Sequence, residues 1–167
     1  MKKILQDLSL EELETLVLSL GEKKFRASQL YTGLMLGKAI SSVNIPAGLR
    51  ERLLNEYEDL PVKIIKTLKS TDGTQKYLFA LADGNVIEGV LMSYKYGNTQ
   101  CVSTQVGCRM GCKFCASTLG GLVRNLTSGE ILSQVLAVNA ANGGNLSKRA
   151  VTNLVLMGSG EPLDNYQ

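Results

Sequence analysis

The sequence contains no histidine and no tryptophan, and only three phenylalanines and six tyrosines among its 167 residues. The lack of histidine matters because a zinc site normally takes four protein ligands, and no imidazole is present to join cysteines in one. The scarcity of aromatic residues leaves no evident platform on which bases could stack. Any site chemistry must therefore come from other residue types.

A long apolar run is also missing. No stretch approaches the roughly 18 apolar residues that a membrane-spanning helix requires, so we expect no membrane segment. The residues at 1–7, MKKILQD, break any signal-peptide core. Four cysteines without a secretion signal indicate a reducing, cytoplasmic location, where thiols serve metals or chemistry. The net charge of +3 permits an RNA or nucleotide partner without requiring one.

Three of the four cysteines, Cys108, Cys112 and Cys115, lie in one short stretch with the spacing C-x3-C-x2-C. Disulfides need paired partners at a set separation, and three adjacent thiols do not supply them. Core packing is the plain alternative for a buried thiol, but the flanking glycine, arginine and lysine argue against it. The spacing favours a metal centre. Three ligands to a four-iron cluster would leave one iron open to a substrate or cofactor.

Residues 1–60 have the periodicity of short helices. Ser9 and Glu12 form a capping box before an apolar-periodic run that ends at Gly21. Further helices are predicted over 27–35 and from about 46 to 57, which together indicate a small helical accessory domain resembling an RNA-binding one. Its basic residues either contact phosphates or form a solvated face, and we favour the solvated face. These residues are Lys23, Lys24, Arg26, Arg50 and Arg52.

Residues 61–95 have a period of two. Strands are predicted over 62–68, 76–81 and 86–92, with turn signals between them at 71–74 and 82–85. This order predicts an antiparallel adaptor. Glu88 interrupts the third strand, where it would face solvent or, if it faced inward, need a partner. The residues alone leave its role open.

Residues 96–167 alternate strand, helix and strand. One strand is predicted over 99–106, a helix capped by Thr127 or Ser128, and an apolar strand over 153–157 buried on both faces. Such an order gives a βαβ crossover and a parallel pair. The segment Gly158-Ser-Gly-Glu-Pro162 follows the last strand, at the sheet edge where ligands bind in α/β folds. Its glycines permit a close approach to a ligand, and Glu161 can accept hydrogen bonds from an ammonium group. Cys101, taken alone, is more simply a packed strand residue.

These motifs together resemble the radical S-adenosylmethionine (SAM) enzymes, and more narrowly the RlmN/Cfr family of RNA adenine methyltransferases. The resemblance is carried by CVSTQVGC at 101–108, RNLTSGE at 124–130, MGSGEPL at 157–163 and, more weakly, FRASQL at 25–30. It covers the chain from about residue 5 onward. It implies an α/β fold in which the helical domain (1–60) and adaptor (61–95) precede the first βαβ portion of a radical SAM partial TIM barrel (96–167).

The resemblance also implies a role for each site residue. Cys108, Cys112 and Cys115 would hold a [4Fe-4S] cluster, and SAM would bind its open iron. Gly160 and Glu161 would bind the methionyl end of SAM. Glu88 matches the family's proton acceptor. Cys101 matches a thiol that resolves a protein–RNA adduct through a transient disulfide.

The implied activity is radical methylation of adenine carbon 2 in 23S rRNA and tRNA. A flavodoxin-type reductant would supply electrons, and the full-length enzyme would be a monomer. The sequence departs from the family because all four cysteines already have roles and none can carry the methyl group. We therefore expect the N-terminal part of a longer enzyme, inactive alone. The alternatives are a Cfr-type carbon-8 methyltransferase, another radical SAM enzyme, or a non-catalytic zinc or iron–sulfur module.

Overall fold

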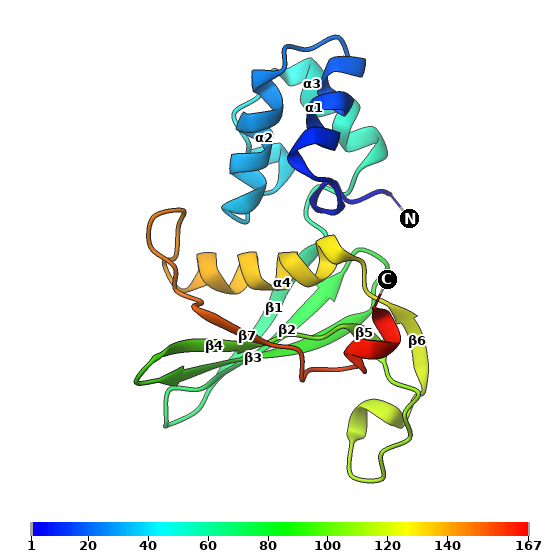
Figure 1. Cartoon of the computed structure of the whole chain (residues 1–167), viewed down its shortest axis with the longest axis vertical. Helices are drawn as coiled ribbons and strands as arrows, with labels where there is room; N and C mark the ends of the chain where they lie inside the picture. Colours follow the sequence, from blue (N-terminus) through cyan, green and yellow to red (C-terminus); the bar gives the residue numbers. More distant parts are fainter. Residues whose placement is uncertain (1, 167) are drawn as a thin grey trace.

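In the computed structural model, which describes residues 2–166, the chain is a helical bundle above a sheet, with one long helix between them (Figure 1). The bundle contains α1 (Leu10–Ser19), α2 (Phe25–Met35) and α3 (Ala47–Glu56), with short 3-10 turns at Leu5–Asp7 and Ile40–Ser42. The predicted capping box of α1 is confirmed, because Ser9 and Glu12 each accept from the other's backbone N–H. The bundle has its own apolar core, which includes Leu13, Leu30 and Leu53.

The sheet has five strands in the order β1-β2-β3-β4-β7. β1 (Val62–Lys69), β2 (Gln75–Leu81), β3 (Val86–Tyr94) and β4 (Gly97–Cys101) form an antiparallel meander. β7 (Asn153–Val155) pairs with β4 in parallel. The predicted βαβ unit is confirmed: β4 and β7 are joined through α4 (Ser128–Ala141), which covers one face of the sheet (Figure 1). A second core, including Phe79, Ile87 and Val138, lies between α4 and the sheet.

The predicted strand over 99–106 is instead two strands. The chain leaves the sheet after Cys101 and resumes as β5 (Gln105–Gly107), which pairs with β6 (Leu122–Asn125) in a separate hairpin. A buried break needs partners for its backbone groups. Gln134 of α4 supplies them, accepting from Ser103 N at 3.0 Å and donating to Ser103 O at 2.9 Å. Gln134 lies 31 residues from Ser103 in the sequence, so the alternating pattern of residues 99–106 alone predicted a continuous strand.

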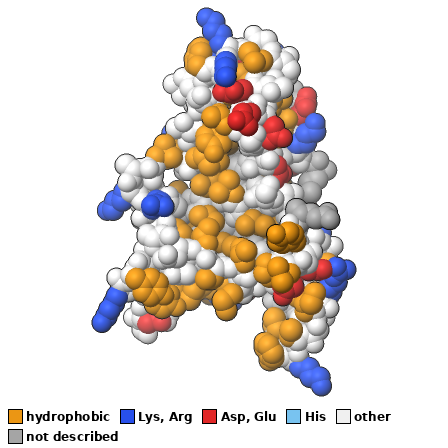
Figure 2. Space-filling model, viewed as in Figure 1, with side chains coloured by type: hydrophobic (Ala, Val, Ile, Leu, Met, Phe, Trp, Pro, Cys, Tyr) orange, Lys and Arg blue, Asp and Glu red, His pale blue; other side chains and the backbone are white. Residues whose placement is uncertain are grey.

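The expectation that the last strand is buried on both faces is wrong. β7 is an edge strand, and Leu154 and Met157 are 53% and 79% exposed. Within β7 itself only Val155 is partly buried. Figure 2 shows hydrophobic side chains spread across the side of the molecule that carries β7 and the loop before β6. An apolar strand therefore ends the described sheet with an open edge.

The helical bundle meets α4 through Asp7. Its carboxylate accepts from Gly129 N at 2.6 Å and Ser128 Oγ at 3.0 Å, at the positive end of α4. A Cβ on Gly129 would lie 2.8 Å from Asp7 N and 2.8 Å from Ile4 Cγ2, so only glycine permits this contact. The bundle is thus attached to the helix that also supports the strand break.

Arg124 fixes the start of α4 to the β2–β3 turn. It contacts the buried Glu130 at 2.8 Å and Asp83 at 2.6 Å. Burial would raise the pKa of Asp83, but hydrogen bonds from Arg124 and Asn85, with the charge of Arg124, outweigh it and lower the pKa to about 2. Glu130 is also the N3 residue of the capping box with Thr127, which confirms the predicted cap.

This network predicts acid-sensitive stability. The lowered pKa means that the unfolded chain binds a proton at Asp83 before the folded chain does, so the contribution is complete above the ordinary value of 3.8 and is lost as pH falls toward about 2. We expect the stability difference between the parent and Asp83→Asn to shrink by roughly 1 kcal/mol between pH 6 and pH 2, after allowance for solvent screening. Urea unfolding at both pH values measures it. A difference independent of pH would contradict the assignment.

Candidate cofactor site at the end of the sheet

The glycine turn (residues 158–162) lies directly against the strand break and β5. Thr104 N and Gln105 N both donate to Ser159 O, at 2.9 and 3.2 Å, and Gly158 N donates to Val102 O at 3.1 Å. A Cβ on Gly158 would lie 2.6 Å from Val102 O, and one on Gly160 would lie 2.7 Å from Gln105 Cβ. The two glycines are therefore required first by the packing of the turn on its own chain.

The cysteine loop (residues 108–121) leaves the end of β5 and returns as β6 (Figure 1). Gly107 has φ +75°, which permits the sharp exit, and Cys108 N donates to Gly121 O at 3.1 Å to close the base of the loop. The predicted placement of both motifs at one edge is present in the structure. The path differs, because the loop follows β5 and not a long strand.

The three loop cysteines differ in environment. Cys108 is buried, Cys112 is exposed and Cys115 is half-buried. Within residues 2–166, no three Cys, Asp or Glu side chains lie close enough together to hold a metal ion. The predicted convergence of three sulfurs on one point is thus not present in this structure. The donor chemistry still fits an iron–sulfur cluster, since thiolates are its ligands and all three come from one short loop.

A pocket of about 230 Å³ brings other predicted residues together. It is lined by Glu88, Cys101 and Cys115, together with Met157 and Gly158 at the start of the glycine turn. Burial raises the pKa of the Cys101 thiol, although a hydrogen bond from the backbone of Met157 opposes the shift. Cys101 is therefore a protonated, half-buried thiol at neutral pH, facing the same space as Glu88 and Cys115 of the loop.

Glu88 has a partner that sequence reasoning missed. Lys76 on β2 places Nζ 2.8 Å from Glu88 Oε2. The two residues lie on one face of the antiparallel pair, because Leu78 is opposite Glu88 and Lys76 is two positions away. The β-strand periodicity predicted both strands but not their register, and only the register shows the pair. Both side chains are partly exposed, so the contact positions the carboxylate more than it stabilises the fold.

Glu161 does not point into this pocket. Its Oε1 accepts from Leu163 N at 3.0 Å, which caps the 3-10 turn at Pro162–Asn165, while its own N–H donates to the side chain of Gln105 at 2.9 Å. Asp164 follows in the same turn and contacts Arg109 of the cysteine loop. Hydrogen bonds from Arg109 and Gln105 lower the pKa of Asp164. Asp164 lies outside the sequence motifs, and Gln105, although it lies within CVSTQVGC at 101–108, was assigned no role there.

All four cysteines are free. The disulfide inferred for Cys101 is therefore not supported by the structure. No helix in the part of the chain that the structure describes is both long enough and apolar enough to cross a membrane.

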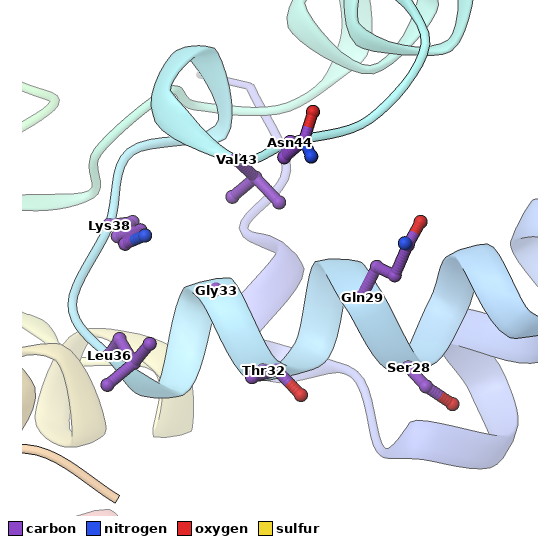
Figure 3. A pocket seen from close by; sticks show the side chains of 8 residues that line it. All are labelled: Ser28, Gln29, Thr32, Gly33, Leu36, Lys38, Val43 and Asn44. Atoms are coloured by element: carbon purple, nitrogen blue, oxygen red, sulfur yellow. The ribbon is translucent and has the colours of Figure 1, made fainter.

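The basic residues of the helical bundle make local contacts. Arg50 donates to the carbonyls of Val43 and Ile45, and Arg52 to that of Leu20. These two arginines therefore bind backbone of the bundle itself, and the choice between a phosphate site and a solvated face stays a prediction. A pocket of about 380 Å³ lies beside α2 in this bundle, lined mainly by hydroxyl, amide and aliphatic side chains with Lys38 as its one charge (Figure 3). The helix α2 lies on the far side of α4 from the cysteine loop (Figure 1).

The comparison with solved structures shows which class of protein has this fold. The fold matches the crystal structure of a radical SAM methyltransferase from Sphaerobacter thermophilus with a TM-score of 0.87 and 39% sequence identity, over 98% of this chain and 49% of that one. The described chain thus has the fold of part of a radical SAM methyltransferase. No family model matches the sequence.

The relatives found by sequence have more specific names than the solved structure. A protein of Clostridium botulinum named "Probable dual-specificity RNA methyltransferase RlmN" is 52% identical over 166 residues, covering 96% of this chain and 47% of that protein. A protein of the same name from Lachnoclostridium phytofermentans is 48% identical over 163 residues, covering 95% and 44%. These matches agree with the resemblance to the RlmN/Cfr family carried by the motifs, because nearly the whole chain is similar to part of proteins named as RNA methyltransferases. The chain spans about half the length of the curated relatives it matches.

Proposed function

We propose that this chain is the cluster- and cofactor-binding part of an RNA adenine methyltransferase that modifies carbon 2. The observation that carries the proposal is the attachment of the glycine turn to β5, the strand that leads into the cysteine loop. This attachment occurs in a chain about half identical to proteins named as RNA methyltransferases. A three-cysteine loop or a glycine-rich turn alone would be weak support, whereas their connection is specific.

In this proposal Cys108, Cys112 and Cys115 hold the [4Fe-4S] cluster. Gly160 and Glu161 receive the methionyl end of SAM. An adenine C–H at carbon 2 is neither acidic nor nucleophilic, and the bound cofactors supply the one-electron chemistry that such a bond requires. The protein's own part is to position the cofactors and the adenine, to exclude water and to move protons. Because Cys112 is exposed and Cys108 buried, the loop must close when the three thiolates act together.

Glu88 and Cys101 act from the adjoining pocket. Glu88 accepts the proton released from the modified adenine ring, and the ion pair with Lys76 holds its carboxylate in place. Cys101 is the reactive thiol of the same space, and its protonated state requires a neighbouring base before it can attack.

The substrates proposed are an adenine of 23S rRNA and one of tRNA. A flavodoxin-type reductant would donate the electrons, and the enzyme would be a monomer.

We propose three units: a helical accessory unit (1–60) that approaches RNA, a β adaptor (61–95) that carries Glu88, and a radical SAM core (96–167). The pocket beside α2 supports an RNA contact in the first unit, because Gln29, Thr32 and Asn44 in its lining offer donors and acceptors (Figure 3).

A chimera tests the function. The chain replaces the matching half of the Clostridium botulinum relative, to which it is 52% identical, and the product is reconstituted anaerobically. We expect 2-methyladenosine in both 23S rRNA and tRNA digests, measured by mass spectrometry, and none in a matched Cys112→Ala chimera. Formation of 8-methyladenosine would favour the Cfr-type alternative. Because its four cysteines are all placed elsewhere, the 167-residue chain alone should give no methylated product.

A further inference from the structure

Asp164 lies between the cysteine loop and the glycine turn. The guanidinium of Arg109 meets its carboxylate with two donors: Nε donates to Oδ2 at 2.8 Å, and Nη2 donates to Oδ1. Arg109 directly follows the first cysteine of the loop, and Asp164 lies two residues beyond the glycine turn. A bidentate arginine–carboxylate contact fixes the orientation of the two side chains as well as their distance. The pair thus sets how the loop begins relative to the turn.

Gln105 extends this contact into the core. Its side chain is fully buried, and it donates to Asp164 Oδ2 at 3.0 Å and to Asn125 Oδ1 at 2.9 Å. Its Oε1 accepts from Glu161 N at 2.9 Å. One amide on β5 therefore holds the carboxylate and the backbone of Glu161 together. A buried amide with all these partners is a rigid link.

The loop has few other attachments. Apart from the two bonds of Arg109, the hydrogen bonds made by residues 108–121 within the described chain join members of the loop to one another. The side chain of Asp164 is only 13% exposed, whereas that of Arg109 is 63% exposed. A nearly buried carboxylate needs its partners, so loss of Arg109 would leave Asp164 with Gln105 alone. The contact is therefore more than an incidental surface pair.

We propose that Asp164 is a positioning residue that ties the cysteine loop, through Arg109, to the glycine turn, through Gln105. The tie sets the separation between the three thiols and the segment that receives SAM. Its effect on cofactor binding rests on the proposed function, but the tie itself does not. Asp164 touches neither cofactor in this assignment, so its loss should loosen the loop without removing a ligand.

Hydrogen–deuterium exchange of the 167-residue chain without cofactors tests the tie. Asp164→Asn and Arg109→Ala should each raise the exchange rate of peptides from 109–119 by about 5-fold or more, and the double variant should add little to either. Lys113→Ala is the matched control, since it removes a cation from the same loop that makes no hydrogen bond within the described residues. Peptides from α1 report any general loss of structure. Unchanged exchange in the Arg109→Ala chain, whose substituted side chain is exposed, would overturn the tie.

A second measurement tests the positioning role. After anaerobic reconstitution, Asp164→Asn should weaken SAM binding about 5- to 10-fold while the iron content per chain equals that of the parent. Faster loop exchange with unchanged SAM affinity would overturn the positioning role. If the parent chain itself takes up no cluster, the proposed function fails, and the exchange measurement then decides the tie by itself.

Discussion

Replacing Cys112 by alanine is expected to abolish uptake of a four-iron cluster. A [4Fe-4S] cluster with three protein ligands has no spare thiolate, so loss of one leaves two irons without protein ligation. Iron and sulfide content after anaerobic reconstitution should fall from about four atoms per chain to near zero. The Cys108→Ala and Cys115→Ala chains should give the same result. Cys112 is the most informative position because it is exposed in the structure, so its replacement leaves the fold undisturbed.

Cys101→Ala is the matched control for this experiment. It also removes a thiol from the end of the sheet, and Cys101 lines the same pocket as Cys115. Because Cys101 is not a ligand in the proposal, this chain should retain its iron. Equal iron loss in the Cys101→Ala chain, or full iron in the Cys112→Ala chain, would refute the ligand assignment.

Replacing Gly107 by alanine is expected to be the most destabilising single change at the base of the loop. Gly107 has φ +75°, and a Cβ there would lie 2.0 Å from Gly121 O, which is backbone and cannot swing aside. The left-handed conformation costs an alanine about 1–2 kcal/mol, and overpacking adds about 1–3 kcal/mol. We expect a loss of roughly 2–5 kcal/mol in the free energy of unfolding, measured by urea denaturation.

Gly121→Ala separates the two causes. Gly121 has φ +70°, nearly the same backbone conformation, but nothing lies within 4 Å of an added Cβ. This chain should lose only the conformational part, about 1–2 kcal/mol. Equal losses in the two variants would mean that the close approach of Gly107 to Gly121, and with it the closed base of the cysteine loop, is absent in solution.

Local signals in the sequence predicted much of the fold. The capping boxes at Ser9–Glu12 and Thr127–Glu130 are complete within four residues each, so both helix starts were predictable. The hairpin turns and the βαβ order were predictable for the same reason, since turn chemistry and periodicity are short-range properties. The motifs also indicated that the cysteines and the glycine turn would meet at one edge.

Long-range hydrogen bonds account for most of what the sequence did not predict. The break after Cys101 depends on Gln134, and Asp7 reaches the start of α4 from the other end of the chain. Gln105 and Asp164 look like ordinary polar residues until the fold brings them together. The same applies to Lys76 beside Glu88. Such pairs have no spacing rule, because tertiary register decides them.

The most direct test of the central claim is a SAM titration of the anaerobically reconstituted, reduced chain, followed by electron paramagnetic resonance. A cluster held by three cysteines has an open iron, so SAM should shift the signal of a four-iron cluster in proportion to its binding. Analogues of SAM that lack the amino and carboxylate groups of its methionyl end should leave the signal unchanged. A chain that takes up one equivalent of zinc, or a four-iron cluster whose signal is indifferent to SAM, would contradict the claim.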